Sequence, residues 1–206
     1  MSHHYRKLSL GQGLSLCIFG LLAGLVFLLV APRIKFFPGQ VLLLLGSWVF
    51  FWFFSHDLAH HIIGRIVRVD FRYYFLGRSA ITKLKLPFVS RLARSIPILS
   101  LKVDKPSLEG LSQIRIGLMY SAGTFASMLV PFLVLPVALS IQMLLGVFFA
   151  LLTLANLLFT IYFSSRAGDL SRAHKSPDRI IPFEIIMSQN RLISLHYRSR
   201  VDNILY

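Results

Sequence analysis

Four long apolar runs, nearly free of charged residues, constrain this chain more than any other feature of its sequence. The first covers residues 14–31 and holds 18 residues without a charge. As a helix rising about 1.5 Å per residue, it nearly crosses a hydrocarbon core of about 30 Å. The other runs cover residues 41–63, 116–135 and 141–163, and only the end of the second carries ionisable groups. We predict an all-α polytopic membrane protein with about four transmembrane helices.

The composition supports this class. Of the 206 residues, 55% are hydrophobic, and the mean hydropathy of +0.68 exceeds that of soluble globular proteins. The net charge is +14, which in a soluble protein would indicate nucleic acid as a partner. In a membrane protein, basic residues instead collect in cytosolic loops and meet anionic headgroups, so we expect the lipid bilayer and no nucleic acid as a partner. A single cysteine, Cys17, excludes an intrachain disulfide.

The distribution of Lys and Arg predicts the orientation. The loop 64–115 carries 11 Lys and Arg, the tail 164–206 carries 7, and the connection between the third and fourth runs carries none. Both termini are therefore predicted in the cytosol, with the cell membrane as the location and residues 1–206 as one membrane domain. Arg33 and Lys35 do not fit this topology, because it places them on the side of the membrane opposite the cytosol. The first run is longer than a usual signal-peptide core and lacks a small-residue cleavage site, so we interpret it as a retained span.

Two weaker patterns lie outside the four runs. In the basic loop, apolar residues alternate with more polar ones, which indicates a short β-hairpin at the membrane surface; they are Val67, Val69, Phe71, Tyr73 and Phe75. In the tail, residues 180–193 form a candidate amphipathic segment. Within the third run, Pro131 and Pro136 are expected to kink or end the helix.

The end of the second run carries the most specific pattern in the chain. His56 and His60 are four residues apart, so on a helix they share one face and can bind one metal ion. Asp57 stands beside them, where a carboxylate can accept a proton from a bound water. Ionisable groups at membrane depth are costly and usually functional. The alternative is that the helix ends near Phe54 and these residues lie solvated among the headgroups.

A hydrolytic zinc site needs a third protein ligand and one open position. Asp169 is the best candidate, because the predicted topology brings the ends of the second and fourth helices to the same side. The alternative is that Gly168 caps the fourth helix and Asp169 is only solvated. His61 and His174 are weaker candidates for ligands or for partners of ligands.

These residues resemble a known family. The segment from His56 to His60, His-Asp-Leu-Ala-His, resembles the His-Glu-x-x-His zinc motif of the site-2 protease family of intramembrane metalloproteases. The segment from Ser121 to Ser127 is similar to the Ala-Gly-Pro-x-Ala-Asn segment of that family. Asn156 followed by Gly168 and Asp169 is similar to its late Asn and Asp motif. Asp57 stands where the family has glutamate, and Thr124 where it has proline.

The resemblance implies one zinc ion held by His56, His60 and Asp169, with Asp57 as the general base and Asn156 near the site. The implied activity is that of a zinc metalloendopeptidase, a hydrolase that cleaves transmembrane segments of membrane proteins near the cytosolic face. The substrate helix would have to unwind, and an exposed strand edge in residues 67–75 is expected to hold it extended.

Two other functions remain open at this stage. A catalytically inactive relative could bind or regulate membrane proteins, because Asp57 is one methylene shorter than glutamate. A membrane di-iron desaturase or hydroxylase also uses His-x-x-x-His-His segments, but such sites need about eight histidines, and this chain has 7, of which two lie at the N-terminus. A haem site between facing helices is disfavoured, since no histidine lies in the first, third or fourth run. The sequence predicts neither the substrate nor the oligomeric state.

Overall fold

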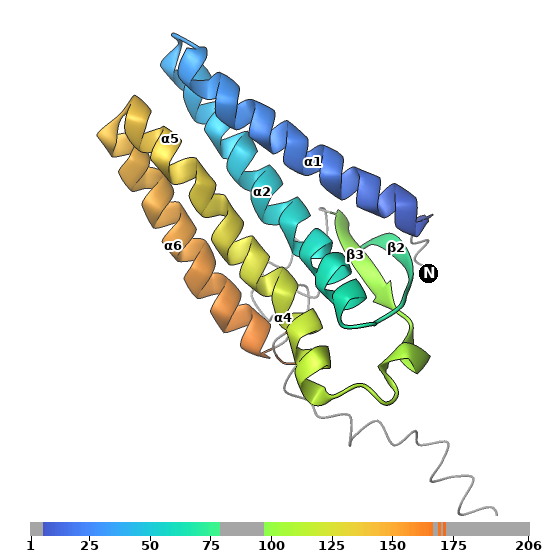
Figure 1. The fold of residues 1–206 in the computed structure, drawn as a ribbon. Coiled ribbons are helices and arrows are strands. Elements are labelled where there is room, and N and C mark those ends of the chain that lie inside the picture. Colours follow the sequence, from blue (N-terminus) through green and yellow to red (C-terminus); the bar gives the residue numbers. More distant parts are fainter. Residues whose placement is uncertain (1–5, 79–96, 167–168, 170, 172–206) are drawn as a thin grey trace, which may run out of the picture. The chain divides into compact units, whose positions relative to one another are not determined.

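The computed structural model describes residues 6–78, 97–166, 169 and 171, all within one unit of the chain, Met1–His174. Long helices lie side by side, with a small sheet at one end of the bundle (Figure 1). The elements, in chain order, are β1 (Arg6–Leu8), α1 (Leu10–Val30), η1 (Ala31–Arg33), α2 (Phe37–Ile66), β2 (Phe71–Arg78), β3 (Pro97–Val103), η3 (Lys105–Leu108), α4 (Gln113–Leu129), η4 (Val130–Leu133), α5 (Val134–Ile141) and α6 (Met143–Arg166).

Four helical segments in the described residues are long and apolar enough to cross a membrane, which confirms the predicted number of such helices. They are Leu10–Arg33, Phe37–Ile66, Gln113–Ile141 and Met143–Ser164. The first begins four residues before the predicted start. Ser9 and Gln12 explain this difference, because each accepts a hydrogen bond from the other's backbone N–H and together they form a capping box.

The third span is longer than predicted and is interrupted rather than ended by its prolines. α4 gives way to the single 3-10 turn of η4, which contains Pro131, and α5 then continues to Ile141. Pro136 is tolerated because it lies in the first turn of α5, where its missing N–H is not needed. The prediction that this span ends at residue 135 is therefore wrong, and only Gln142, in extended conformation, separates α5 from α6.

A three-stranded antiparallel sheet, in the order β1-β2-β3, closes one end of the bundle. The prediction of strands in the basic loop is confirmed, and β1 is an addition from the N-terminal segment. The connection between β2 and β3, residues 79–96, lies outside the described residues. Most of the predicted tail, including residues 180–193 and His174, lies outside them too.

The observed strand differs from the predicted one in its start and in its alternation. Val67 caps the C-terminus of α2, so the strand begins only at Phe71. An irregularity between Phe71 and Tyr73 then breaks the alternation, so that Phe71 and Tyr74 are buried. β2 is also the central strand, because β1 pairs along Tyr74 to Leu76. The prediction of an exposed strand edge in residues 67–75 is therefore wrong where β1 pairs with β2. Among the described strands, the edge of the sheet opposite β1 belongs to β3.

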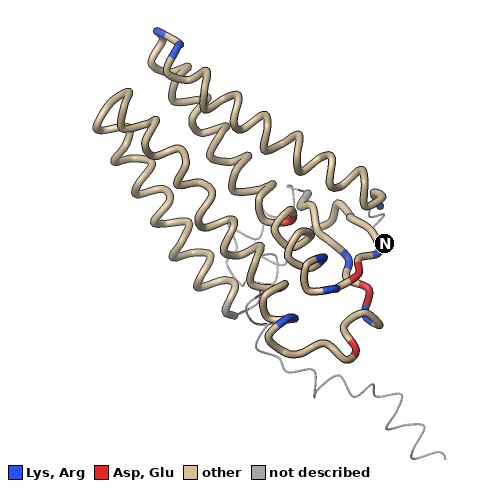
Figure 2. Tube along the Cα trace, viewed as in Figure 1, with Lys and Arg blue, Asp and Glu red and all other residues tan. Residues whose placement is uncertain are grey.

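The two ends of the bundle differ in chemistry. We call the end with the three strands the sheet end and the end with η1 and the α5–α6 turn the far end. An apolar core joins α1, α2, α5 and α6 and includes Leu44, Trp48, Phe51 and Phe149. In the described residues, Arg33 and Lys35 are the basic residues of the far end, and most other charges lie near the sheet end (Figure 2). This asymmetry agrees with the predicted orientation, which the structure does not test.

Candidate metal centre

α2 continues without a break past Phe54 to Ile66, so His56 and His60 lie on a regular helix. The alternative in which the helix ends near Phe54 is therefore wrong. The two imidazole rings lie one turn apart, with centroids 4.7 Å apart and planes at 87°. The His60 side chain is 10% exposed and the His56 side chain 33%, so the pair stands at the border of the buried region.

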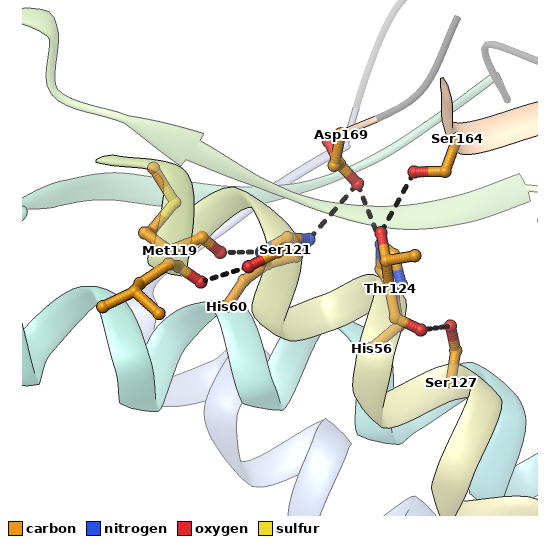
Figure 3. Close-up of polar contacts among 9 residues, drawn as sticks. His56, His60, Met119, Ser121, Thr124, Ser127, Ser164 and Asp169 are labelled. Atoms are coloured by element: carbon orange, nitrogen blue, oxygen red, sulfur yellow. Dashed lines mark hydrogen bonds and ion pairs between the residues drawn. The ribbon is translucent and has the colours of Figure 1, made fainter. Parts of the chain in front are cut away.

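Asp169 meets both histidines, although more than a hundred positions separate it from them in the sequence. Its Oδ2 lies 3.4 Å from Nε2 of His56 and 3.3 Å from Nε2 of His60 (Figure 3). Donor atoms of these three residues all lie within 4.8 Å of one another. The predicted ligand set is thus brought together, and Asp169 is not merely a solvated residue after α6.

The two contacts of Asp169 have the lengths expected around a zinc ion, and the whole group of donor atoms lies within 4.8 Å. Four donors arranged tetrahedrally at about 2.0 to 2.2 Å from zinc are about 3.3 to 3.6 Å apart, which matches both contacts of Asp169. Two imidazoles and one carboxylate also form the three-ligand set of hydrolytic zinc sites, in which the fourth position takes water.

The charge of Asp169 suits this role. Burial raises the pKa of the Asp169 carboxyl, but hydrogen bonds from His56 and His60 outweigh it and hold that pKa well below its usual range. A depressed pKa means that the ionised form is favoured and is lost only as the pH falls toward strongly acidic values. At neutral pH, Asp169 is therefore a carboxylate, the form that binds metal.

A carbonyl of α4 orients His60. Nδ1 of His60 lies 2.7 Å from the Met119 carbonyl oxygen, in a buried contact. A carbonyl can only accept, so Nδ1 donates to it, and Nε2 is the nitrogen that faces Asp169 and would bind a metal ion there. Metal-binding histidines are commonly oriented in this way. No side-chain pattern in the sequence could have indicated Met119, because the contact uses its backbone.

Asp57, the predicted base, is 5% exposed. It is not a member of the group of three donors, which in the described residues consists of His56, His60 and Asp169. Its carboxylate interacts electrostatically with all three of them. Burial and, to a smaller extent, the nearby Asp57 carboxylate raise the pKa of the Tyr74 phenol of β2. Asp57 therefore lies next to the centre but outside the set of ligand atoms.

Two other predicted residues do not meet the donors. The buried ring of His61 stacks on Phe71 and Tyr74, with centroids 5.5 and 5.9 Å away. Asn156 donates from Nδ2 to the Ser127 carbonyl at 3.0 Å and so ties α6 to α4. His174 lies outside the described residues.

One further polar contact near the site was not predicted. The hydroxyls of Thr124 and Ser164 lie 3.1 Å apart, buried between α4 and α6 (Figure 3). Ser127 donates to the Thr124 carbonyl at 3.0 Å. Together with the bond of Asn156, these contacts fix the end of α6 just before Asp169. Thr124 is the residue at which the chain departs from the proline of the family pattern, and its hydroxyl makes a contact that proline cannot.

Comparison of the chain with protein-family models, with curated proteins and with solved structures found no match in any of the three.

Proposed function

We propose that this protein is an intramembrane zinc metalloprotease that cleaves transmembrane segments near the cytosolic face. The observation that carries the proposal is the convergence of His56, His60 and Asp169, three donors from the ends of two membrane-spanning helices. Such a ligand set, at the end of helices long enough to cross a bilayer, supports the proposal of hydrolytic chemistry beside the lipid. It is also the set that the resemblance to the site-2 protease family implies.

Each residue has a distinct task in this mechanism. A bound zinc ion would polarise the scissile carbonyl and lower the pKa of water toward about 7. His60 keeps Nε2 available because Nδ1 donates to Met119. Asp57 accepts the proton of the attacking water. Because aspartate is one methylene shorter than glutamate, its carboxylate would reach the attacking water through a second water or a local adjustment of the helix.

The substrate must present an extended backbone, because the carbonyls of a helix are already hydrogen-bonded. The edge of β3, rather than β2, is the strand that we expect to pair with it. β3 also contacts α2, the helix that carries the two histidines. A transmembrane helix that unwinds at its cytosolic end would reach both the strand edge and the metal centre.

The test is a cleavage assay in proteoliposomes with a labelled single-span peptide that carries helix-breaking residues near its cytosolic end. We expect the zinc-loaded protein to cleave it, a chelator to stop cleavage, and added zinc to restore it. His60→Phe should abolish cleavage. His61→Phe is the matched control, because the same change on the other side of α2 keeps the stacking on Phe71 and Tyr74 and should leave the rate close to that of the wild type.

The main alternative is a catalytically inactive relative that binds membrane proteins. The observation in its favour is that Asp57 stands in place of glutamate and is one methylene shorter. If the zinc-loaded protein binds such peptides but leaves all of them intact, this alternative replaces the protease.

A further inference from the structure

Gly123 of α4 lies directly against the metal centre. A Cβ added at this position would clash with Nε2 and Cδ2 of the His60 ring. It would also stand 2.8 Å from the backbone carbonyl oxygen of His56. A ring can rotate away from a new methyl group, but the backbone of α2 cannot move without displacing the whole helix.

An alanine methyl at position 123 would meet Nε2 of His60 first, and this is the nitrogen that would bind the metal. Nε2 of His60 is the nitrogen that faces Asp169, 3.3 Å from its Oδ2. Its ring is held from the other side by the bond from Nδ1 to the Met119 carbonyl, one turn before Gly123 on the same helix. The ring therefore cannot give way to a methyl group without losing that bond or turning Nε2 away from Asp169.

We propose that Gly123 is a positioning residue for the metal centre: its missing side chain lets α4 orient His60 through Met119 while leaving the ligand nitrogen unobstructed. The inference rests on the proposed function for the identity of the centre. It adds a requirement that none of the ligands themselves reveals, namely that position 123 carry no side chain.

The same helix offers a matched control. Gly117 lies six residues earlier on α4, and an added Cβ there would meet nothing within 4 Å. Both replacements by alanine raise intrinsic helix propensity by about 1 kcal/mol, so propensity cancels in the comparison. A difference between Gly123→Ala and Gly117→Ala therefore reports the environment of position 123.

The experiment measures binding of zinc to the purified chain, and of cobalt as a spectroscopic probe of tetrahedral coordination. We expect Gly117→Ala to bind both metals like the wild type. Gly123→Ala should lose at least about 10- to 100-fold in affinity, the range seen when a partner of a metal ligand is removed, and its cobalt bands should weaken or shift. An unchanged affinity and spectrum in Gly123→Ala would overturn the proposal.

Thermal unfolding of metal-free protein tests the contact even if Gly123→Ala folds poorly. In the His60→Ala background the clashing ring is absent, so Gly123→Ala should lower the midpoint less than it does in the wild type. Equal losses in both backgrounds would show that the contact is not with His60 and would overturn the proposal. A wild type that binds neither metal would contradict the proposed function, whereas this cycle would still decide whether Gly123 makes room for the ring.

Discussion

Two neighbouring pairs of residues on α2 have the same spacing but different surroundings. His56 and His60 point toward α4 and meet Asp169, with side chains 33% and 10% exposed. Asp57 and His61, each one position later, are 5% and 9% exposed and pack toward α1 and β2. In the first pair, the Nε2 atoms of both histidines face the Asp169 carboxylate, where a metal ion would bind. The second pair is enclosed by aromatic rings and a buried thiol.

Spacing on a helix selects the face on which two residues lie, whereas the neighbouring elements decide what that face can bind. On the α4 side, the polar atoms of His60 are paired by Met119 and Asp169. On the other side, the His61 Nδ1 and the Tyr74 hydroxyl are buried without a hydrogen-bond partner in the described part of the chain. Each unpaired buried group costs about 1 to 3 kcal/mol. The enclosed side is therefore costly to the fold.

The largest effect that separates the two sides is expected from Asp57→Asn. The amide keeps the shape of the side chain but cannot accept a proton, so the cleavage rate should fall by about 10² to 10⁴ while zinc stays bound. Cleavage kinetics together with metal analysis check this. If the variant loses zinc together with activity, Asp57 supports the metal ligands instead of serving as the base. That result would contradict the assignment of metal binding to His56 and His60 alone of these two pairs.

Asp57→Glu should have a smaller effect, in the opposite direction. The carboxylate lies outside the donor group, and one more methylene carries it closer to the attacking water. We therefore expect a faster cleavage rate at unchanged zinc content. A slower rate with zinc retained would mean that the centre has been remodelled around the shorter side chain.

A third change affects only the enclosed side. Tyr74→Phe removes a hydroxyl that has no partner in the described residues and keeps the ring that stacks on His61. The free energy of unfolding should rise by about 1 kcal/mol, with zinc affinity unchanged. Unfolding in detergent mixtures measures the first quantity and metal titration the second. A loss of stability would reveal a partner for the hydroxyl, such as a buried water.

The smallest effect is expected far from both pairs. Nε1 of Trp48 donates to the Thr153 hydroxyl at 3.0 Å and joins α2 to α6 within the apolar core. Thr153→Val keeps the shape and removes the acceptor, which should cost about 0.6 kcal/mol, as is typical of hydrogen bonds between membrane helices. Unfolding of the variant beside the wild type checks this value, and an altered zinc affinity would contradict the separation of the core from the site.

Much of the fold could be predicted because lipid imposes a simple pattern. Four uncharged runs of sufficient length indicate four helices, and the spacing of His56 and His60 places them on one face. Helix ends were harder to predict, because Ser9 extends α1 through a cap and Pro136 is harmless only in the first turn of a helix. The strand pattern failed at the irregularity after Phe71, since one extra residue reverses the faces that follow.

The site was partly predictable for a different reason. The two histidines follow from local spacing, but the choice of Asp169 depended on topology and on a family resemblance. The contribution of Met119 is a backbone contact and leaves no mark in its side chain. His61 shows the opposite limit: it adjoins His60 in sequence, yet one step along a helix turns it by about 100° to another surface.

The most direct test of the central claim is the metal content of the purified protein and of its Asp169→Ala variant. We predict one zinc per chain in the wild type and little or none in the variant, because Asp169 supplies one of the three candidate ligands among the described residues. Two irons per chain would instead support a di-iron oxygenase. A wild type without metal, or a variant that binds zinc as tightly as the wild type, would contradict the proposed centre.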